Sequence, residues 1–140
     1  MFQRASLSLA DARAAVAAVL AATTAADKPT AVAVVDHRGD LLCCARQDHA
    51  PSRMLRRARA KAYTAATLGL DTVVFRDSVV TTPGRTLDDW GDPNITALRG
   101  GLVARVDGMV VGAIACSGGT QERGEQLAGI GLRAMGLATG

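Results

Sequence analysis

Aromatic side chains are scarce in this chain of 140 residues, which is 49% hydrophobic but carries only Phe2, Tyr63, Phe75 and Trp90 as aromatics. Proteins that bind single-stranded nucleic acids need aromatic platforms for base stacking, and duplex binders need a recognisable docking element. The sequence shows neither, so we expect no nucleic-acid partner despite the net charge of +3. The apolar residues are mainly Ala and Val, and their small side chains limit the core. We expect a homo-oligomer, because association adds burial.

Cysteines and long apolar runs are also scarce. The three cysteines, Cys43, Cys44 and Cys116, have no paired spacing, which excludes a disulfide framework and favours a reducing compartment. No run approaches the roughly 18 apolar residues that a membrane-spanning helix requires. Asp11 and Arg13 interrupt the Ala-rich start of the chain, which argues against a signal peptide. We therefore expect a cytoplasmic protein without a membrane partner.

The sequence does contain a regular order of helix and strand patterns. Ser8 with Asp11 is a typical helix start, and Asp107-Gly108 between two apolar runs is a strong hairpin signal. Strands joined by hairpins give an antiparallel sheet onto which helices pack. We expect one α+β domain over residues 1–140, with helices over 9–26, 52–68 and 121–137, strands over 31–36, 40–46, 101–106 and 109–117, and a long loop over 71–98.

Residues 100–120 form a glycine-rich hairpin that carries a recognisable pattern, GGLVARVDGMVVGAIACSGGT. Short segments of the first half agree with it, namely Leu9–Ala12, Ala33–Asp36, Gly39–Leu42, Arg46–Asp48 and Ala60–Ala66. Together they resemble the GlcG/HbpS-like haem-binding family, a domain that also occurs at the C-terminus of some propanediol-utilisation-type cobalamin adenosyltransferases. The resemblance implies a profilin-like antiparallel sheet with flanking helices and a homo-oligomer, often up to an octamer. It also implies binding of haem, iron or a corrinoid, with haem degradation in some members.

The start of the last predicted helix is a candidate seat for an anionic ligand. Backbone N–H groups at a helix N-terminus favour negative charge, and glycines allow close approach. The predicted seat consists of Ser117, Gly118, Gly119 and Thr120. The loop over 71–98 adds Trp90, which suits a planar ligand, and Arg85 and Arg99, which suit a carboxylate. Long loops inside small domains are often functional, so we expect this loop near the ligand pocket.

Three further residues are candidates for catalysis. His49 suits a general base or a ligand for a metal or haem iron, because imidazole is the side chain typical of both roles. Asp48 beside it suits proton transfer or a cap at the helix entry. Lys61, which we expect largely off the buried stripe of its helix, suits a partner for a ligand carboxylate, a solvated helix face or an intersubunit ion pair. Asp88, Asp89 and Asp92 offer oxygen donors for a metal or simply face water, and no metal site is assigned.

Three functions remain open from the sequence. The first is a small-ligand-binding protein with an anion-favouring pocket, for haem, another tetrapyrrole or iron. The second is a cofactor-free enzyme of the isomerase, lyase or hydrolase type that transfers a proton on a small carboxylated metabolite. The third is an assembly protein. Zinc-ligand spacings, phosphate-binding loops, dinucleotide fingerprints and nucleophile elbows are all absent from the sequence, which argues against a familiar hydrolase or dehydrogenase.

Overall fold

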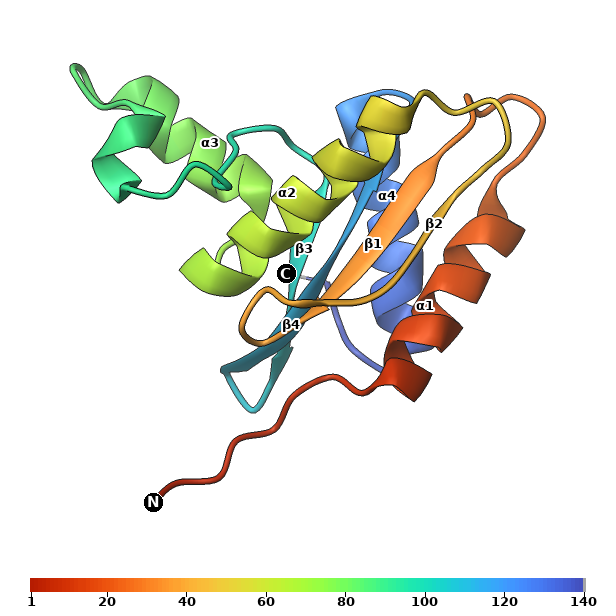
Figure 1. The fold of residues 1–140 in the computed structure, drawn as a ribbon, viewed down its shortest axis with the longest axis horizontal. Coiled ribbons are helices and arrows are strands. Elements are labelled where there is room, and N and C mark those ends of the chain that lie inside the picture. Colours follow the sequence, from red (N-terminus) through yellow and green to blue (C-terminus); the bar gives the residue numbers. More distant parts are fainter. Residues whose placement is uncertain (140) are drawn as a thin grey trace.

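Two hairpins build the centre of the molecule. The computed structural model describes residues 1–139 and contains a four-stranded antiparallel sheet (Figure 1). The first hairpin supplies β1 (Ala31–Asp36) and β2 (Leu41–Arg46), and the second supplies β3 (Gly101–Val106) and β4 (Met109–Ser117). The strand order is β2-β1-β4-β3, so each hairpin contributes one central strand and one edge strand. The predicted α+β class, an antiparallel sheet with flanking helices, is confirmed.

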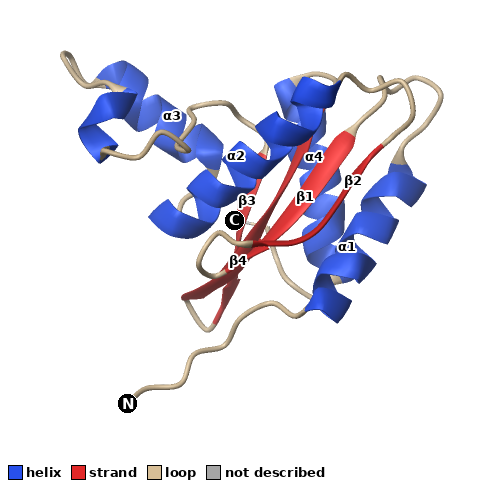
Figure 2. Cartoon of the chain, in the orientation of Figure 1, coloured by secondary structure: helices blue, strands red, loops and turns tan. Residues whose placement is uncertain are grey.

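Helices cover both faces of this sheet (Figure 2). Helices α1 (Leu9–Ala22) and α4 (Gln121–Ala134) share the larger core cluster, to which β1 contributes Val32 and Val34. Helix α2 (Ser52–Leu68) packs on the opposite face, against Ala31 and Ala33. This alternation follows from the period of two along a strand. Cys43 and Cys44 consequently pack on opposite faces of the sheet.

Small residues allow these layers to approach closely. At Gly131 of α4, an added Cβ would lie 2.3 Å from Cδ1 of Ile114, so any larger residue would push the helix off the sheet. On the opposite face of the sheet, α2 also approaches closely through small side chains, since Ala58, Ala62 and Ala65 are all at 0% exposure. The core is therefore dense but thin, as the composition predicts.

The predicted helix start at Ser8 is confirmed, whereas two helix ends are wrong. Ser8 and Asp11 form a reciprocal capping box. Helix α1 ends at Ala22 rather than at residue 26, because Thr23 is extended and the carboxylate of Asp27 accepts the N–H of Thr24 in a turn. Helix α4 ends at Ala134 rather than at residue 137, because the backbone at Gly136 is left-handed, with a φ of +76°.

The prediction of one long loop over 71–98 is also wrong. It contains helix α3 (Thr72–Thr81) and the 3₁₀ turn η1 (Leu87–Trp90), which together project from the body of the molecule. Phe75 of α3 packs edge-on against Trp90 with 4.8 Å between ring centroids. Only Thr72 and Phe75 of this helix are buried, and its four valines do not fall on one buried stripe at helical spacing. Across residues 1–139, no helix is long and apolar enough to cross a membrane.

Candidate functional site

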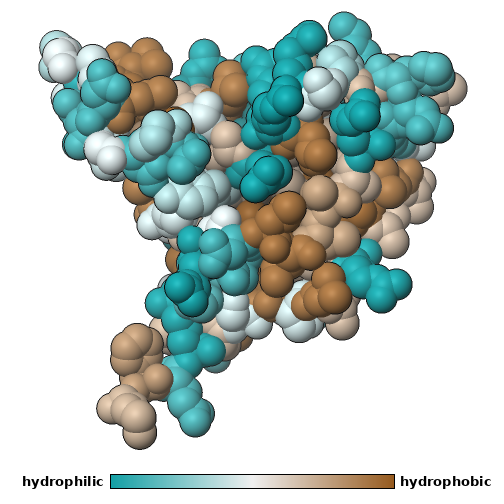
Figure 3. All heavy atoms as spheres, viewed as in Figure 1, coloured by the Kyte–Doolittle hydropathy of each residue, from teal (hydrophilic) through white to brown (hydrophobic). Residues whose placement is uncertain are grey.

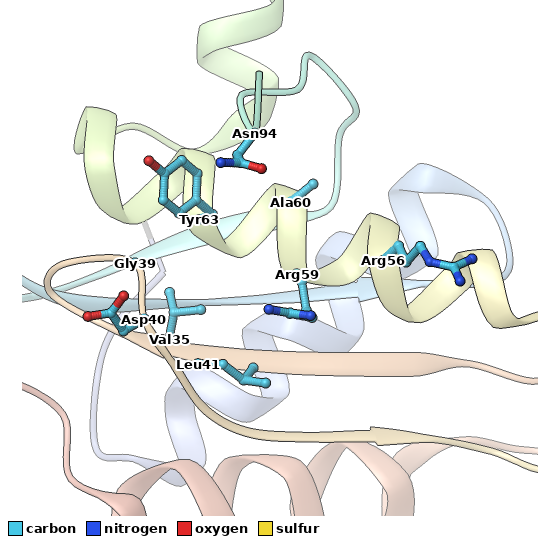
Figure 4. A pocket seen from close by; sticks show the side chains of 9 residues that line it. All are labelled: Val35, Gly39, Asp40, Leu41, Arg56, Arg59, Ala60, Tyr63 and Asn94. Atoms are coloured by element: carbon cyan, nitrogen blue, oxygen red, sulfur yellow. The ribbon is translucent and has the colours of Figure 1, made fainter. Parts of the chain in front are cut away.

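A pocket of about 410 Å³ lies between one side of α2 and the turn that joins β1 to β2 (Figure 4). Four lining residues come from α2, at positions three or four apart, so the helix presents them on one side. The others come from the end of β1, from the turn and from the segment after η1. The pocket, called the α2 pocket below, is lined by Val35, Gly39, Asp40, Leu41, Arg56, Arg59, Ala60, Tyr63 and Asn94.

The floor of the α2 pocket depends on a glycine in the β1–β2 turn. Gly39 has a φ of +86°, and an added Cβ would lie 2.7 Å from Cδ2 of Tyr63. Only glycine therefore lets the tyrosine ring rest on the turn. The carboxylate of Asp36 accepts the N–H groups of Arg38 and Asp40, at 2.8 and 3.0 Å, which holds the turn in shape.

Tyr63 connects the pocket to the projecting segment. Its hydroxyl donates to Asp92 across 2.5 Å. This bond raises the pKa of the Tyr63 phenol and lowers the pKa of the Asp92 carboxyl, because it favours neutral tyrosine beside an ionised carboxylate. Asn94, two residues further on, reaches the pocket wall. The segment after η1 is thus fixed over the C-terminal half of α2.

Two arginines give the α2 pocket a positive wall. Within residues 1–139, neither Arg56 nor Arg59 makes a side-chain hydrogen bond or an ion pair with a protein carboxylate. Both are exposed, and Figure 4 shows their side chains on the same helix as Tyr63. Asp40 is the single carboxylate among the lining residues. The guanidinium groups therefore remain available to an anionic ligand.

At the predicted anion seat before α4, three of the four residues make contacts within the chain. Ser117 is buried and its hydroxyl donates to Sδ of Met54 at 3.5 Å. Gly118 presses on the chain at Pro29, where an added Cβ would lie 2.4 Å from the carbonyl oxygen. The Thr120 hydroxyl accepts the N–H of Arg123 and caps the helix. Gly119 is exposed, with open space beside it. These residues do not line the α2 pocket, and their role stays a prediction.

The arginines predicted to clamp a carboxylate have partners within the chain. Arg99 binds Glu122 at 2.9 Å and Glu125 at 2.6 Å, both on α4. Its hydrogen bond to Glu125 raises the pKa of the guanidinium. Arg85 lies over the ring of Trp90, 4.7 Å from its centroid, in a cation–π contact. Trp90 thus packs between Arg85 and Phe75 and does not line the α2 pocket.

The three residues predicted to be catalytic are divided between the surface and the interior. His49 is exposed with a φ of +70°, and Asp48 lies beside it at the rim of an open polar pocket of about 500 Å³. The helix entry carries no side-chain cap at all. Lys61 was expected largely off the buried stripe of α2, but it is only 4% exposed and faces the sheet. That expectation was wrong.

Lys61 occupies a gap made by glycines. Its ammonium donates to the carbonyl oxygen of Cys116 at 2.9 Å, and an added Cβ at Gly100 would lie 2.8 Å from Nζ. Burial lowers the pKa of Lys61 to about 8 from its ordinary value of 10.5. Burial also raises the pKa of the Cys116 thiol to about 12, so the thiol stays protonated and this cysteine is a core residue.

Metal ligands are not gathered anywhere among residues 1–139, since no group of three His, Cys, Asp or Glu side chains lies close enough to hold an ion. Asp89 instead accepts the N–H of Thr86 and caps η1. The site residues that sequence reasoning missed are Arg56, Arg59, Tyr63 and Asn94. The available signal was the pair of arginines three residues apart on a helix that carries no acidic residue.

Three known proteins are similar to this chain in sequence or in fold. A protein of 15.0 kDa from the dhaT–dhaS intergenic region of Citrobacter freundii is 36% identical over 129 residues, covering 90% of this chain and 89% of that protein. HbpS of Streptomyces reticuli, in a doubly substituted form, superposes with a TM-score of 0.84 at 30% identity, over 94% of this chain and 88% of that one. A PduOC–haem complex superposes with a TM-score of 0.83 at 25% identity, over 96% and 98%.

A sequence model of the HbpS-like family, described as haem-degrading proteins, matches residues 7–133. This range takes in every helix and strand except the last residue of α4. The family expectation drawn from the glycine-rich hairpin is therefore confirmed, and the chain belongs to the HbpS-like family.

Proposed function

We propose that this protein binds a small carboxylated ligand in the α2 pocket, with haem or a related tetrapyrrole as the first candidate. The observation that carries the proposal is the pair of unpartnered arginines, Arg56 and Arg59, on one wall of the pocket. Its volume of about 410 Å³ falls in the range of roughly 300–1,000 Å³ that is usual for small-molecule sites. Membership of the HbpS-like family and the fold shared with a haem complex support the choice of ligand.

The residues present fit the periphery of a haem better than its iron. Arg56 and Arg59 suit the two propionates, and Val35, Leu41 and the Tyr63 ring offer a partly apolar wall. The lining contains no imidazole and no thiol, and the hydroxyl of its one phenol, Tyr63, already donates to Asp92, so the carboxylates and the ring faces would carry the attachment. Bound haem supplies redox chemistry at iron, while this chain's own residues bind and orient the macrocycle.

Haemin titration, followed by absorbance at the Soret band, tests this proposal. We expect Arg56→Gln and Arg59→Gln each to weaken binding about tenfold, since a charge-assisted hydrogen bond contributes roughly 1.5–3 kcal/mol. Arg53→Gln is the matched control, because Arg53 is exposed on the same helix but does not line the pocket. Equal weakening in all three variants, or in none, contradicts the proposal.

The same titration compares the α2 pocket with the seat predicted from sequence. Gly118 is a poor probe, because its added Cβ would clash with Pro29 and disturb the fold. Gly119→Val adds a side chain into open space and blocks the seat without that clash. His49→Asn removes the imidazole and keeps the left-handed backbone, which Asn tolerates. Loss of binding in either variant, with Arg56→Gln unaffected, moves the site to the start of α4 or to His49.

Tyr63 favours a second candidate, the proton-transferring enzyme. A neutral phenol hydrogen-bonded to Asp92 stands beside two arginines that suit a substrate carboxylate. The phenol oxygen can accept a proton from a bound metabolite as the phenol passes its own proton to the Asp92 carboxylate, which is the base of the pair. Exchange of carbon-bound hydrogen for deuterium in a panel of small carboxylates, read by NMR in heavy water, tests this function. We expect Tyr63→Phe to abolish exchange while ligand binding persists; exchange that continues in this variant contradicts the role of Tyr63.

A further inference from the structure

The α2 pocket carries opposite charges toward its two ends. Figure 4 shows Arg56 and Arg59 toward one end of the pocket and Asp40 and Tyr63 toward the other. Arg59 precedes Tyr63 by four residues on α2, which corresponds to about 6 Å along the helix axis. Among residues 1–139, no ion pair joins Asp40 to either arginine. Opposite charges therefore face the same cavity without neutralising each other.

The negative end of the pocket combines a carboxylate with an aromatic ring. The Tyr63 ring lies against Gly39, the residue before Asp40 in the chain. The hydrogen bond to Asp92 is the main cause of the raised pKa of Tyr63, and partial burial and the negative charges of Asp92 and Asp40 add to it. Asp40 is thus close enough to act electrostatically on the phenol. A carboxylate beside an aromatic ring is a favourable environment for an ammonium group.

The carboxylate of Asp40 is available to a ligand, because the turn is held by backbone groups. Asp40 donates its N–H to the carboxylate of Asp36 at 3.0 Å, and its carbonyl oxygen accepts the N–H of Asp36 at 2.9 Å. Within residues 1–139, the Asp40 carboxylate makes one contact, an ion pair with Arg38 at 3.9 Å in which both side chains are 72% exposed. Exposed pairs of this kind contribute little free energy.

The part of the pocket that comes from the strands is apolar. Val35 at the end of β1 is buried, and Leu41 at the start of β2 is 40% exposed. Figure 3 shows hydrophobic atoms over the area where β1 and β2 lie, with hydrophilic atoms beside them over α2 and the β1–β2 turn. A short chain of methylene groups suits such a surface, because both lose contact with water.

We infer that Asp40 makes the α2 pocket selective for small amino-carboxylates, which carry a carboxylate at one end and an ammonium at the other. The ligand carboxylate pairs with Arg56 and Arg59, and the ammonium lies beside Asp40 and the Tyr63 ring. This inference rests on the proposed function for the carboxylate end and adds the opposite end. A second carboxylate there meets the like charge of Asp40, which disfavours dicarboxylates. The two propionates of haem lie on one edge of the macrocycle, so haem engages the arginines alone.

Three ligands of similar length test the selectivity of the wild-type protein. They are δ-aminovalerate, glutarate and valerate, which carry an ammonium, a carboxylate and a methyl group at the far end, and each is titrated by NMR. We expect δ-aminovalerate to bind about fivefold more tightly than valerate, the upper range for an exposed ion pair, and more tightly than glutarate. Equal affinities, or a preference for glutarate, overturn the inference. Failure of all three to bind overturns the carboxylate site together with it.

Asp40→Asn assigns the selectivity to its residue, with Asp107→Asn as the matched control. Asparagine keeps the shape of the side chain and removes its charge. Asp107 is an exposed aspartate in the turn of the other hairpin and does not line the pocket, so its variant changes the net charge equally. We expect Asp40→Asn to bind δ-aminovalerate no better than valerate and Asp107→Asn to retain the preference. A preference that survives in Asp40→Asn, or disappears in both variants, overturns the role of Asp40.

Arg59→Gln separates this inference from the proposed function. The variant removes a partner of the carboxylate that all three ligands share, so we expect it to weaken their binding by a similar factor. If Arg59→Gln weakens all three while Asp40→Asn leaves their order unchanged, the carboxylate site stands and the selectivity for an ammonium is wrong. If Arg59→Gln weakens none of them, the proposed site is wrong and the inference fails with it.

Discussion

The two edge strands, β2 and β3, come from equivalent hairpins but meet different neighbours. Five residues, 47–51, link β2 to α2, and none of these described residues accepts a hydrogen bond from the backbone N–H of Cys44 or Arg46. A much longer segment separates α2 from β3, and its helix α3 begins beside β3. Asp71 stands at the N-cap position of α3 but makes no side-chain cap to its own helix; it accepts the N–H of Val103 instead. A helix start can therefore serve to close a sheet rather than to stabilise its own helix.

The largest effect on the closed edge is expected from Gly101→Val. An added Cβ would lie 2.7 Å from the carbonyl oxygen of Lys61 and 2.9 Å from Cγ2 of Thr72, so β3 could no longer fit between α2 and α3. We expect a loss of about 3 kcal/mol in the free energy of unfolding, measured with urea. Gly119→Val is the control, because its side chain meets open space. An equal loss in both variants would mean that β-branching rather than crowding is responsible.

The next effect concerns Lys61, which is buried beside the start of β3. Its folded-state pKa of about 8 lies below the ordinary 10.5, so between these values the unfolded chain binds more protons and stability rises with pH. We expect a gain of roughly 2 kcal/mol between about pH 8 and 9.5, relative to Lys61→Met. The comparison with Lys61→Met is necessary because Cys116, with a pKa raised from 9.0 to about 12, acts in the opposite direction above pH 9. Identical slopes in both proteins would contradict this assignment.

Asp71→Ala opens the closed edge without crowding it. The N–H of Val103 loses its acceptor, and we expect a loss of about 1–2 kcal/mol in the free energy of unfolding. Faster amide exchange at Val103 should accompany this loss, together with concentration-dependent association through the exposed edge. Asp77→Ala, an exposed residue of the same helix that makes no side-chain bond to β3, is the control. Unchanged exchange at Val103 in Asp71→Ala would show that the carboxylate does not guard the edge.

The elements set by local signals could be predicted from the sequence. The capping box at Ser8, the Asp107-Gly108 turn and the Gly69 end of α2 each depend on a few adjacent residues. Helix α3 could not be predicted in this way, since its burial depends on Trp90, which reaches Phe75 from η1. Lys61 was misplaced because a charged residue at a helical position normally faces water. Its burial depends on Gly100 and Cys116, which are remote in sequence.

The α2 pocket shows the same limit of sequence reasoning. Gly39 and Asp40 fall in one predicted hairpin, and Arg56 and Arg59 fall in one predicted helix, but no local signal brings these two groups together. The segment after η1 adds Asn94 from a third place in the chain. A site formed by three distant segments requires the fold to be known first.

The smallest effect is expected from Tyr63→Phe, which loosens the far end of the projecting segment but leaves the β3 edge closed. The Tyr63 hydroxyl binds Asp92, yet the N–H of Thr96 also donates to the Thr64 hydroxyl at 3.0 Å and holds the same segment. Phenylalanine keeps the ring on Gly39. We therefore expect a smaller loss of stability than in Asp71→Ala, faster amide exchange near Asn94, and unchanged exchange at Val103. NMR should also show the pKa of Asp92 rising towards its ordinary value, because its carboxylate loses a hydrogen-bond donor. Exchange at Val103 that quickens as much as in Asp71→Ala would instead show that both ends of the segment open together.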